Sequence, residues 1–453
     1  MLDSVSLSNF RAYESTGEVK LNKLNIFLGA NNAGKSSFSS AVEIFFRSYF
    51  SRGEREPLPF SQMPSLSTFD SVLRQHWGPN AARPKAFVLG FNLTAANSSA
   101  KVSLTYSRDP GDGSPVADTV EYDLGTEQIV LSREKKPGSK RYSLKMGGKA
   151  TGYQDLIFNG LLPYSLEFEG DSRLWMDLRQ KLVLLRVFRD HRPLEIVSPS
   201  RPVPRAIYVL DDPNLGVDDR DLVAYLTQLF SSTEAGDIAT RERIKEHLST
   251  LGLATDFTVS SVSKKTASKI VSLRIAPKTK RQQLTIADVG FGASQVLPLL
   301  VKDARLEDGV LIAYQPEVHL HPFAQARLAD IFVASVKRGN QIFVETHSQD
   351  LILRLQLLMS EGAISPEDVT VFCFENKSSG STIRPINFKS GGVPEVHWPA
   401  GFLDTSIDLA RRIAASRVKS LPPVVAKRVV DPELPRAVKV PPRPKPKSKA
   451  RSK

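Results

Sequence analysis

A glycine-rich loop between an apolar segment and a helix-forming segment constrains this chain more than any other feature. Residues 29–36 read Gly-Ala-Asn-Asn-Ala-Gly-Lys-Ser, which fits the spacing G-x-x-x-x-G-K-S. Residues 24–28 before the loop have strand character, and residues 36–46 after it have the composition of a helix. Strand, loop and helix in this order predict a P-loop, in which backbone N–H groups and the helix N-terminus surround phosphate oxygens.

The two residues that close the loop have different chemical roles. We expect Lys35 to reach the β- and γ-phosphate oxygens and the hydroxyl of Ser36 to ligate Mg²⁺. The sequence therefore predicts ATP and Mg²⁺ as cofactors.

Strand and helix patterns divide the chain into five predicted parts. They are an N-terminal ATPase half with a strand at Val5–Leu7 (1–50), an insertion (51–284), a C-terminal ATPase half (285–375), a small C-terminal segment (376–420) and a tail (421–453). The insertion is β-rich at 86–146 and then helical at 161–187, 222–230 and 240–251, before strands return at 257–275.

The C-terminal half alternates strands and helices. The expected strands are 310–314, 341–345 and 369–375, and the expected helices are 322–338 and 348–361. This alternation predicts an α/β fold with a mostly parallel central sheet covered on both faces.

Three more segments have polar residues where a nucleotide site needs them. Asp288–Gln295 is a Gly/Ser-rich turn that opens a helix, although a turn leading into a core helix would read the same. The strand at 310–314 sits where a strand normally ends in an acid that holds Mg²⁺, but here it ends in Tyr314. The strand at 341–344 precedes Glu345-Thr346-His347-Ser348, and a His at a strand end can sense a γ-phosphate.

These motifs, in this order, resemble a known family. Asn9-Phe10-Arg11, the P-loop, Asp288–Gln295, Gln315-Pro316-Glu317-Val318-His319-Leu320-His321-Pro322 and Glu345-Thr346-His347-Ser348 resemble bacterial AAA-type ATPases related to RecF, SMC and OLD proteins. Trp398-Pro399-Ala400-Gly401-Phe402 resembles the motif of a subgroup with a C-terminal domain of unknown function. Residues 198–205 resemble a Gly-Pro-Leu-Arg segment of the same subgroup.

The resemblance implies a P-loop NTPase with an ABC/SMC-like head that forms a homodimer around two ATP molecules. It implies that Gln315 takes the catalytic-base position and His347 the switch-histidine position, with Glu317 as a partial substitute for the missing acid. The implied nucleotide-binding residues are Arg11, Gly29, Asn31, Asn32, Ala33, Gly34, Lys35, Ser36, Ser37, Gly292, Ser294 and Gln295.

Tyr314 separates ATP binding from ATP hydrolysis in this prediction. A phenol is neutral at pH 7 and is a poor Mg²⁺ ligand, so we expect MgATP to bind and to be hydrolysed slowly. The predicted function is an ATPase that acts as a nucleotide-driven switch in phage defence or genome maintenance, with an effector protein in trans.

The net charge of +13 is concentrated near the C-terminus. Residues 421–453 contain ten Lys/Arg, two acids and eight prolines, which gives +8 there and leaves +5 for the rest. Proline and charge together predict a disordered tail, which could contact DNA non-specifically or serve only solubility.

Other observations bear on location and on other chemistry. No apolar run approaches the ~18 residues that a membrane span requires, and residues 1–4 do not begin a signal peptide, so we expect a cytoplasmic protein. The single cysteine, Cys373, lies in an apolar strand and is expected to be a core residue.

Three alternatives remain open at this stage. One is a DNA-binding module with a structural ATP site, supported by the tail and by a basic hairpin. The hairpin residues are Arg133, Lys135, Lys136, Lys140, Arg141, Lys145 and Lys149. The second is a hydrolase with a metal held by the Asp residues of 211–221. The third is a metal at Glu317, His319 and His321.

Overall fold

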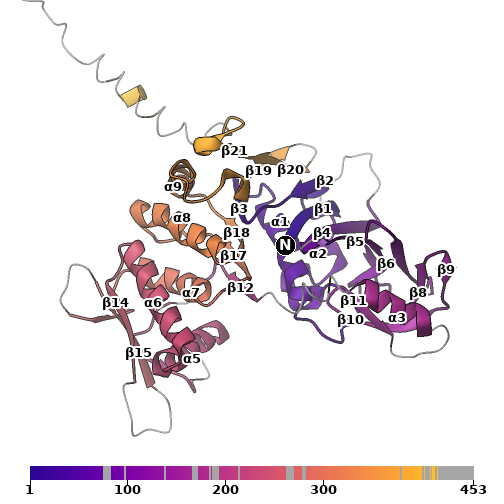
Figure 1. Cartoon of the computed structure of the whole chain (residues 1–453), viewed down its shortest axis with the longest axis horizontal. Coiled ribbons are helices and arrows are strands. Elements are labelled where there is room, and N and C mark those ends of the chain that lie inside the picture. The colour runs from indigo at the N-terminus through magenta and orange to yellow at the C-terminus, as the bar shows by residue number, and fades with distance from the viewer. Residues whose placement is uncertain are drawn as a thin grey trace, which may run out of the picture. The chain divides into compact units, whose positions relative to one another are not determined.

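The computed structural model describes most of the chain up to residue 399 (Figure 1). The described residues are 1–74, 83–95, 98–136, 139–165, 172–182, 185, 193–201, 203–212, 215–261, 270–277, 282–377, 380–399, 402, 409, 411–413 and 416. Met1–Pro399 form one compact unit. The predicted tail at 421–453 lies outside the described residues.

The P-loop strand lies inside a six-stranded sheet. In sheet order the strands are β12 (Leu194–Val197), β17 (Val310–Tyr314), β18 (Gln341–Glu345), β3 (Leu24–Gly29), β19 (Val369–Lys377) and β20 (Gly380–Ile386). The first five run parallel, and β20 runs antiparallel to β19. β17, β18 and β3 are almost entirely buried and mostly apolar, as expected of parallel strands covered on both faces.

A larger sheet in the described chain is antiparallel. Its main path is β11 (Leu162–Ser165), β10 (Gln154–Asn159), β8 (Arg141–Met146), β7 (Gln128–Arg133), β6 (Pro115–Asp123), β5 (Ser98–Arg108), β4 (Ala86–Ala95), β1 (Leu2–Phe10) and β2 (Tyr13–Lys20), with β9 (Lys149–Ala150) paired to β8. A mostly parallel sheet therefore describes only the part of the fold around the P-loop. The β-rich character expected of 86–146 is confirmed, since β4 to β8 lie in this range.

The first strand joins the first two parts of the predicted domain map. Leu7 of β1 pairs with Leu89 of β4, so the N-terminal strand and the β-rich insertion share one sheet. The predicted division at residue 50 is not a break in this sheet. The other predicted divisions stay predictions.

Helix α1 (Lys35–Ser48) packs between the two sheets (Figure 1). The ring of Phe45 lies 4.5 Å from that of Phe91 on β4, and the ring of Phe46 lies 5.8 Å from that of Phe343 on β18. The core is therefore continuous across α1, and it fixes the helix that follows the P-loop.

Helices α7 (Phe291–Ala304) and α8 (Pro322–Lys337) pack on the six-stranded sheet. α7 contacts β12 and β17, whereas α8 contacts β18, β3 and α9 (Gln349–Ser360). Ser348 caps α9 by accepting a hydrogen bond from the backbone N–H of Leu351, 3.2 Å away. The predicted helices of the C-terminal half are thus confirmed.

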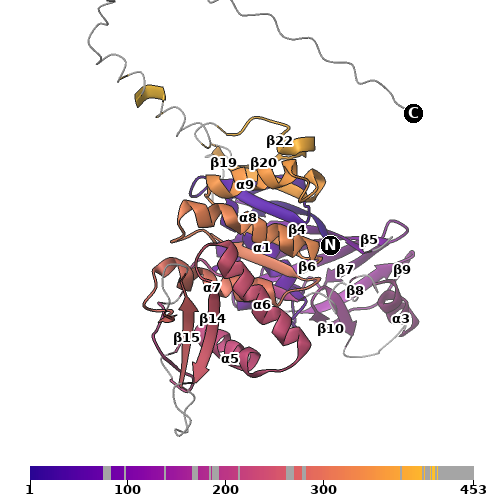
Figure 2. The same cartoon turned by 60° about the vertical axis from the view of Figure 1, so that its left-hand side comes forward.

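A further layer follows β12 in the chain (Figure 2). It contains β13 (Tyr208–Val209), β14 (Asp256–Ser261), β15 (Ile270–Ala276), β16 (Leu284–Thr285), α5 (Val217–Ser231) and α6 (Ala235–Thr250). α5 and α6 both contact β14, and α6 also contacts α7 and α8. The remaining short elements are η1 (Phe60–Gln62), η2 (Pro64–Leu66), α2 (Phe69–Val72), α3 (Ser172–Lys181), η3 (Pro366–Asp368), β21 (Phe388–Lys389), η4 (Ser390–Gly392) and β22 (Val393–Pro394).

The predicted helix at 161–187 is wrong at its start. Asn159 pairs with Leu162 across a two-residue turn, and Gly160 has a φ of 60°, so Leu162–Ser165 returns as a strand. A glycine with positive φ at the first turn position makes a tight hairpin, which here overrides the apolar run. Residues 166–171 lie outside the described residues, and α3 occupies part of the predicted range.

Cys373 lies on β19 and is 1% exposed, as expected of a core residue. Burial raises the pKa of its thiol to about 12, so the nucleophilic thiolate is not formed near neutral pH. No helix in the described part of the chain has the length and apolarity needed to cross a membrane.

We predict that Phe27→Ala lowers the free energy of unfolding by about 3–5 kcal/mol, because it empties a fully buried aromatic site. The Phe27 ring lies 5.4–6.2 Å from the rings of Phe38, Phe343, Phe372 and Phe374, from α1 and both neighbouring strands. Urea unfolding measures the change. Phe50→Ala is the matched control, since Phe50 is 58% exposed and should change stability by less than about 0.5 kcal/mol. Equal effects from the two variants would contradict the central role of this cluster.

Candidate functional site

Two glycines allow the loop between β3 and α1 to make its turn. Gly29 has a φ of 152°, and a Cβ there would lie 2.4 Å from the carbonyl oxygen of Phe374. Gly34 has a φ of 100°, and a Cβ there would lie 2.6 Å from the hydroxyl of Tyr13. The Tyr13 hydroxyl donates to the carbonyl of Gly34 at 2.8 Å. The glycines of the G-x-x-x-x-G-K-S pattern are thus required by backbone conformation and close packing.

The loop is exposed at its tip and buried at its end. Ala30, Asn31 and Asn32 are exposed, Ala33 to Lys35 are buried, Ser36 is exposed and Ser37 is half-buried. Helix α1 begins at Lys35, so its free N–H groups face the space that the loop encloses.

Lys35 folds back over its own loop. Its Nζ donates to the carbonyl oxygens of Gly29 at 3.0 Å and Ala30 at 2.8 Å. Burial lowers the pKa of Lys35, while the carboxylates of Glu345 and Glu317 oppose that shift. The ammonium therefore lies among two carboxylates and the phosphate-binding loop.

Glu345 is a site residue that the sequence analysis did not assign. It ends β18 and is 6% exposed. Ser36 Oγ donates to its two carboxylate oxygens at 3.1 and 3.3 Å, and Ser39 Oγ donates to Oε2 at 3.3 Å. The sequence did contain a signal for this residue. Residues 341–345 form an apolar strand that ends in an acid, which is the pattern expected, and not found, at residue 314.

Tyr314 ends the neighbouring strand and is turned toward α1. Its hydroxyl donates to Glu43 Oε2 at 2.6 Å, and Glu43 Oε1 accepts from Arg47 Nε at 2.7 Å. Burial raises the pKa of Tyr314, and the negative charge of Glu43 raises it further, so the phenol stays protonated. The tyrosine is held as a neutral hydrogen-bond donor.

Glu317 and His347 are brought together as the motif order suggests. Glu317 Oε1 accepts from the backbone N–H of His347 at 2.7 Å, its Oε2 is buried, and the carboxylate also interacts with the side chain of Thr346. Burial raises the pKa of Glu317. Burial also lowers the pKa of His347, and the positive charge of Lys35 adds to that effect, so the exposed imidazole is neutral at pH 7.

Gln315 and Arg11 approach the same region from different elements. Gln315 has a φ of 45°, and its N–H donates to the carbonyl of Glu345 at 2.7 Å. Arg11, also at positive φ, donates from its guanidinium to Ser40 Oγ at 3.5 Å. Ser40 Oγ in turn donates to the carbonyl of Ser36 at 2.6 Å, which links Arg11 to the first turn of α1.

The Gly/Ser-rich turn contacts the loop after β17. A Cβ on Gly292 would lie 2.9 Å from the carbonyl oxygen of His319, and the rings of Phe291 and His319 are 5.9 Å apart. Ser294 Oγ donates to the carbonyl of Phe291 at 2.9 Å. Ser294 lines a small cavity with Arg201 and Tyr208, separate from the cavity that contains Ser36.

Arg201 connects α7 to the end of β17. Its guanidinium donates to the carbonyls of Gln295 at 2.8 Å, Tyr314 at 3.2 Å and Gln315 at 3.0 Å. It belongs to the segment 198–205 that the family resemblance singled out. Arg201 thus links the Gly/Ser-rich turn to the loop that contains Gln315.

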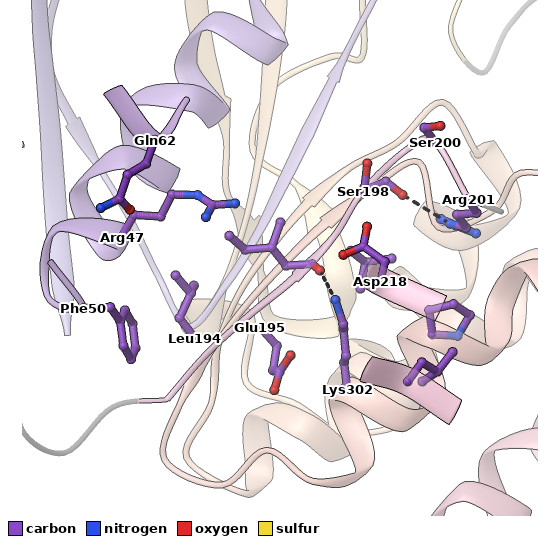
Figure 3. Close-up of a pocket in the computed structure, with 14 residues that line it drawn as sticks. Arg47, Phe50, Gln62, Leu194, Glu195, Ser198, Ser200, Arg201, Asp218 and Lys302 are labelled. Carbon is purple, nitrogen blue, oxygen red and sulfur yellow. Dashed lines mark hydrogen bonds between the residues drawn. The ribbon is translucent and has the colours of Figure 1, made fainter. Parts of the chain in front are cut away.

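Two cavities open beside these residues. The first, of about 400 Å³, is lined by Ser36, Glu43, Tyr314, Gln315 and Glu345 among others. The second, of about 420 Å³, is shown in Figure 3, where Arg47 and Gln62 face Lys302 and Asp218. Both include Arg47, Gln62, Ile196 and Ser198, so they lie side by side. Lys302 Nζ donates to the carbonyl of Ile196 at 2.5 Å (Figure 3).

The residues of the alternative readings have local partners. In the basic hairpin, Arg133 pairs with Asp118 at 2.6 Å and Lys136 with Glu134 at 3.0 Å. Arg205 pairs with Asp212 at 3.0 Å. Among the described residues, no three His, Cys, Asp or Glu side chains gather as a metal-binding group.

Fold and site together define the class of protein. A strand of a parallel sheet leads into the glycine-rich loop and then into a helix, which is the context that a phosphate-binding P-loop requires. The chain belongs to the family described as "AAA ATPase domain", which matches residues 1–107 and 217–352. ATPases of this kind generally use ATP with Mg²⁺. The AAA-type resemblance is thereby confirmed, whereas the subgroup with the Trp-Pro-x-Gly-Phe motif stays a prediction.

Comparison with curated proteins and with solved structures adds no argument to the family match. No curated protein matches the chain. It is similar to the solved SMC head domain from Thermotoga maritima, with 10% identity, TM-score 0.41, and 85% of this chain and 98% of that chain covered.

Two other solved structures are similar to the same extent. One is titled as an SmcHead bound to the C-winged helix domain of ScpA, with 10% identity, TM-score 0.42, and coverage of 86% and 98% of the two chains. The other is an Smc head domain with an extended coiled coil, bound to the C-terminal domain of ScpA derived from Pyrococcus furiosus. It has 10% identity, TM-score 0.43, and coverage of 91% and 99%. At such values neither activity nor partners carry over to this chain.

We predict that Arg201→Lys destabilises the protein by about 1.5–3 kcal/mol, because one ammonium cannot span carbonyls on α7 and on the loop after β17. Urea unfolding measures the loss. Arg205→Lys is the control, since its ion pair with Asp212 is half-exposed and is worth at most about 1 kcal/mol. If the two variants unfold at the same urea concentration, Arg201 is not the link described above.

Proposed function

We propose that this protein binds MgATP at the P-loop and works as a nucleotide-driven dimerising switch that hydrolyses ATP slowly. The observation that carries the proposal is the conformation of the loop itself. Lys35 is held on the carbonyls of Gly29 and Ala30, and Ser36, in the first turn of α1, donates to a carboxylate. A loop with this geometry presents N–H groups, an ammonium and a hydroxyl to one polyphosphate.

The proposed nucleotide contacts follow the motif. In the proposal the residues around ATP are Arg11, Gly29, Asn31, Asn32, Ala33, Gly34, Lys35, Ser36 and Ser37, with Ser36 toward Mg²⁺ and Gln315, Glu317 and His347 toward the γ-phosphate. The neutral imidazole of His347 supports the proposed contact with the γ-phosphate, since its N–H can donate a hydrogen bond to a phosphate oxygen. The hydrogen bond from the backbone N–H of His347 to Glu317 would fix the positions of these two residues relative to each other.

Slow hydrolysis follows from the state of Tyr314. The phenol is buried, protonated and already donates to Glu43, so it supplies no negative charge to a metal ion. ATP binding depends on the loop and not on this position. The two activities are therefore separable in this protein.

The dimer proposal rests on the exposed start of α7. Gly290 is exposed and Phe291 is 54% exposed, so the start of α7 offers its backbone and an apolar ring to a second copy of the chain. In the proposed dimer, Gly292, Ser294 and Gln295 face the nucleotide of the partner copy. The contacts of Gly292 with His319 and of Arg201 with Gln295 would transmit nucleotide state to this surface.

The family resemblance extends the proposal to biology. It favours a role in phage defence or genome maintenance in the cytoplasm, with an effector protein supplied in trans. Non-specific DNA contact through the basic tail is the alternative that remains, and loss of salt-dependent DNA binding on deletion of 421–453 tests it.

We predict that Lys35→Ala abolishes ATP binding and ATP-dependent dimerisation, because the ammonium that neutralises the β- and γ-phosphates is lost. Titration with a fluorescent ATP analogue measures binding, and light scattering with and without ATP measures the mass. Lys23→Ala is the matched control, since Lys23 precedes the same strand, is half-exposed and pairs with Asp368 at 3.0 Å. If wild type binds no ATP, or if Lys35→Ala binds as wild type does, the proposal is wrong.

We also predict that wild-type turnover stays below about 1 s⁻¹, under the median of about 10 s⁻¹ for enzymes. Tyr314→Glu places a carboxylate at the strand end and should raise the rate at saturating MgATP. Because Glu43 then faces a second carboxylate, the double variant Tyr314→Glu, Glu43→Gln removes the repulsion and should raise it further. Phosphate release measures both. Tyr314→Phe is the control that leaves turnover slow, and a wild-type rate of several per second would rule out the prediction.

A further inference from the structure

The structure contains a carboxylate beside the P-loop serine although the expected strand end has none. The order β17, β18, β3 places β18 directly next to the P-loop strand, and β17 one strand further away. Tyr314 at the end of β17 is in register with Glu345, which is in register with Phe27 of β3. A carboxylate at residue 345 is therefore one strand closer to the loop than a carboxylate at 314 would be.

We propose that Glu345 faces the Mg²⁺ ion of bound MgATP, directly or through water, together with Ser36, so that the metal ion is held although residue 314 lacks the acid on which fast turnover depends. This inference rests on the proposed MgATP site. It assigns the metal-facing carboxylate to a residue that neither the motif nor the family match identifies.

The contacts of Glu345 favour this assignment. Both carboxylate oxygens accept from Ser36 Oγ, at 3.1 and 3.3 Å, and Oε2 also accepts from Ser39 Oγ at 3.3 Å. Hydroxyl groups can rotate their hydrogens away and offer lone pairs to a cation, which ammonium and guanidinium donors cannot do. A carboxylate that is 6% exposed and held mainly by hydroxyls is thus ready to exchange those bonds for a metal contact.

Two other carboxylates nearby are less suited to this role. Glu43 is engaged at both oxygens, by the Tyr314 hydroxyl at 2.6 Å and Arg47 at 2.7 Å. Glu317 follows the strand end by three residues and accepts from the backbone of His347. Its second oxygen is buried, and its carboxylate also interacts with the side chain of Thr346, so Glu317 is engaged by the segment around His347 and not by Ser36. Neither Glu43 nor Glu317 has a contact of this kind with Ser36.

The donor set suits Mg²⁺. Hydroxyl and carboxylate oxygens are hard ligands, and Mg²⁺ bound with a nucleotide needs only one or two protein ligands because phosphates and water supply the rest. When bound, the ion would neutralise charge on the β- and γ-phosphate oxygens. Ser36 and Glu345 supply these two protein ligands. No larger metal-binding cluster occurs in the described residues, and none is needed for a metal ion that arrives with a nucleotide.

The test is the metal dependence of nucleotide binding in Glu345→Gln, which keeps the size of the side chain and removes its charge. Mn²⁺ serves as the probe ion, and electron paramagnetic resonance measures free and bound Mn²⁺ in the presence of ATP. We expect Glu345→Gln to lower the affinity for Mn²⁺ by about tenfold or more and to leave the affinity for ATP in EDTA within about twofold. Glu345→Asp keeps the carboxylate and should retain an intermediate affinity.

Two control variants separate Glu345 from its neighbours. Glu375→Gln changes a Glu on β19, the strand on the other side of β3, and should leave Mn²⁺ affinity unchanged. Glu43→Gln removes the carboxylate that binds Tyr314 and should also leave it unchanged. Thermal unfolding establishes that each variant is folded.

The outcomes distinguish the inference from the proposed function. ATP binding by wild type in EDTA, with Mn²⁺ affinity lost only in Glu345→Gln, supports the inference. Unchanged Mn²⁺ affinity in folded Glu345→Gln, or an equal loss in Glu43→Gln, overturns it while the proposed ATP site stands. If Glu345→Gln does not fold, Mn²⁺ affinity of Glu345→Asp equal to wild type overturns it and a partial loss supports it. Failure of wild type to bind ATP in any condition overturns the proposed function itself.

Discussion

The burial of β3 between β18 and β19 is the constraint on which the rest of the site depends. A strand with neighbours on both sides and helices on its faces cannot shift its register without exposing Leu24, Ile26 or Phe27. Gly29 at its end lies against the carbonyl of Phe374, so the loop leaves the sheet at a fixed point. α1 then starts from that point and is held by aromatic contacts to both sheets. The position of the P-loop is therefore set by the core and not by the loop.

The same constraint decides which polar side chains reach the loop. Parallel strands end at one edge of the sheet, so the residues that follow β17 and β18 gather where β3 ends. Tyr314, Gln315, Glu317, Glu345 and His347 all come from these two strand ends. α7 is connected to the same edge by two contacts. Arg201 donates to the carbonyls of Gln295 on α7 and of Tyr314 at the end of β17, and Gly292 of α7 packs against the carbonyl of His319. Nucleotide-dependent movement of the Gln315 loop would thus be coupled to the start of α7 by hydrogen bonds to its backbone.

Local pattern was enough to predict the P-loop, its strand and helix, and the alternating strands and helices of the C-terminal half. Each of these features depends on residues close together in the chain, where spacing and apolar periodicity determine structure. Short strands were harder to predict, because a few residues carry little periodic pattern. β12 is only Leu194–Val197, and its pairing with β17 depends on residues more than a hundred positions away. The hairpin at Gly160 was missed because an apolar run from Leu161 resembled a helix and outweighed the Asn-Gly turn signal.

The site shows the same division between local and distant information. The sequence shows that Tyr314 stands where an acid is expected, but its partner Glu43 lies 271 residues away and could not be inferred. Glu345 and Ser36 are 309 residues apart, and they meet only because β18 lies next to β3 in the sheet. A motif assigns a role to a position along the chain, whereas chemistry requires a carboxylate at a position in space. When strand order brings a second strand end nearer to the phosphate loop, loss of the acid at residue 314 does not by itself remove negative charge from the place where a metal ion would bind.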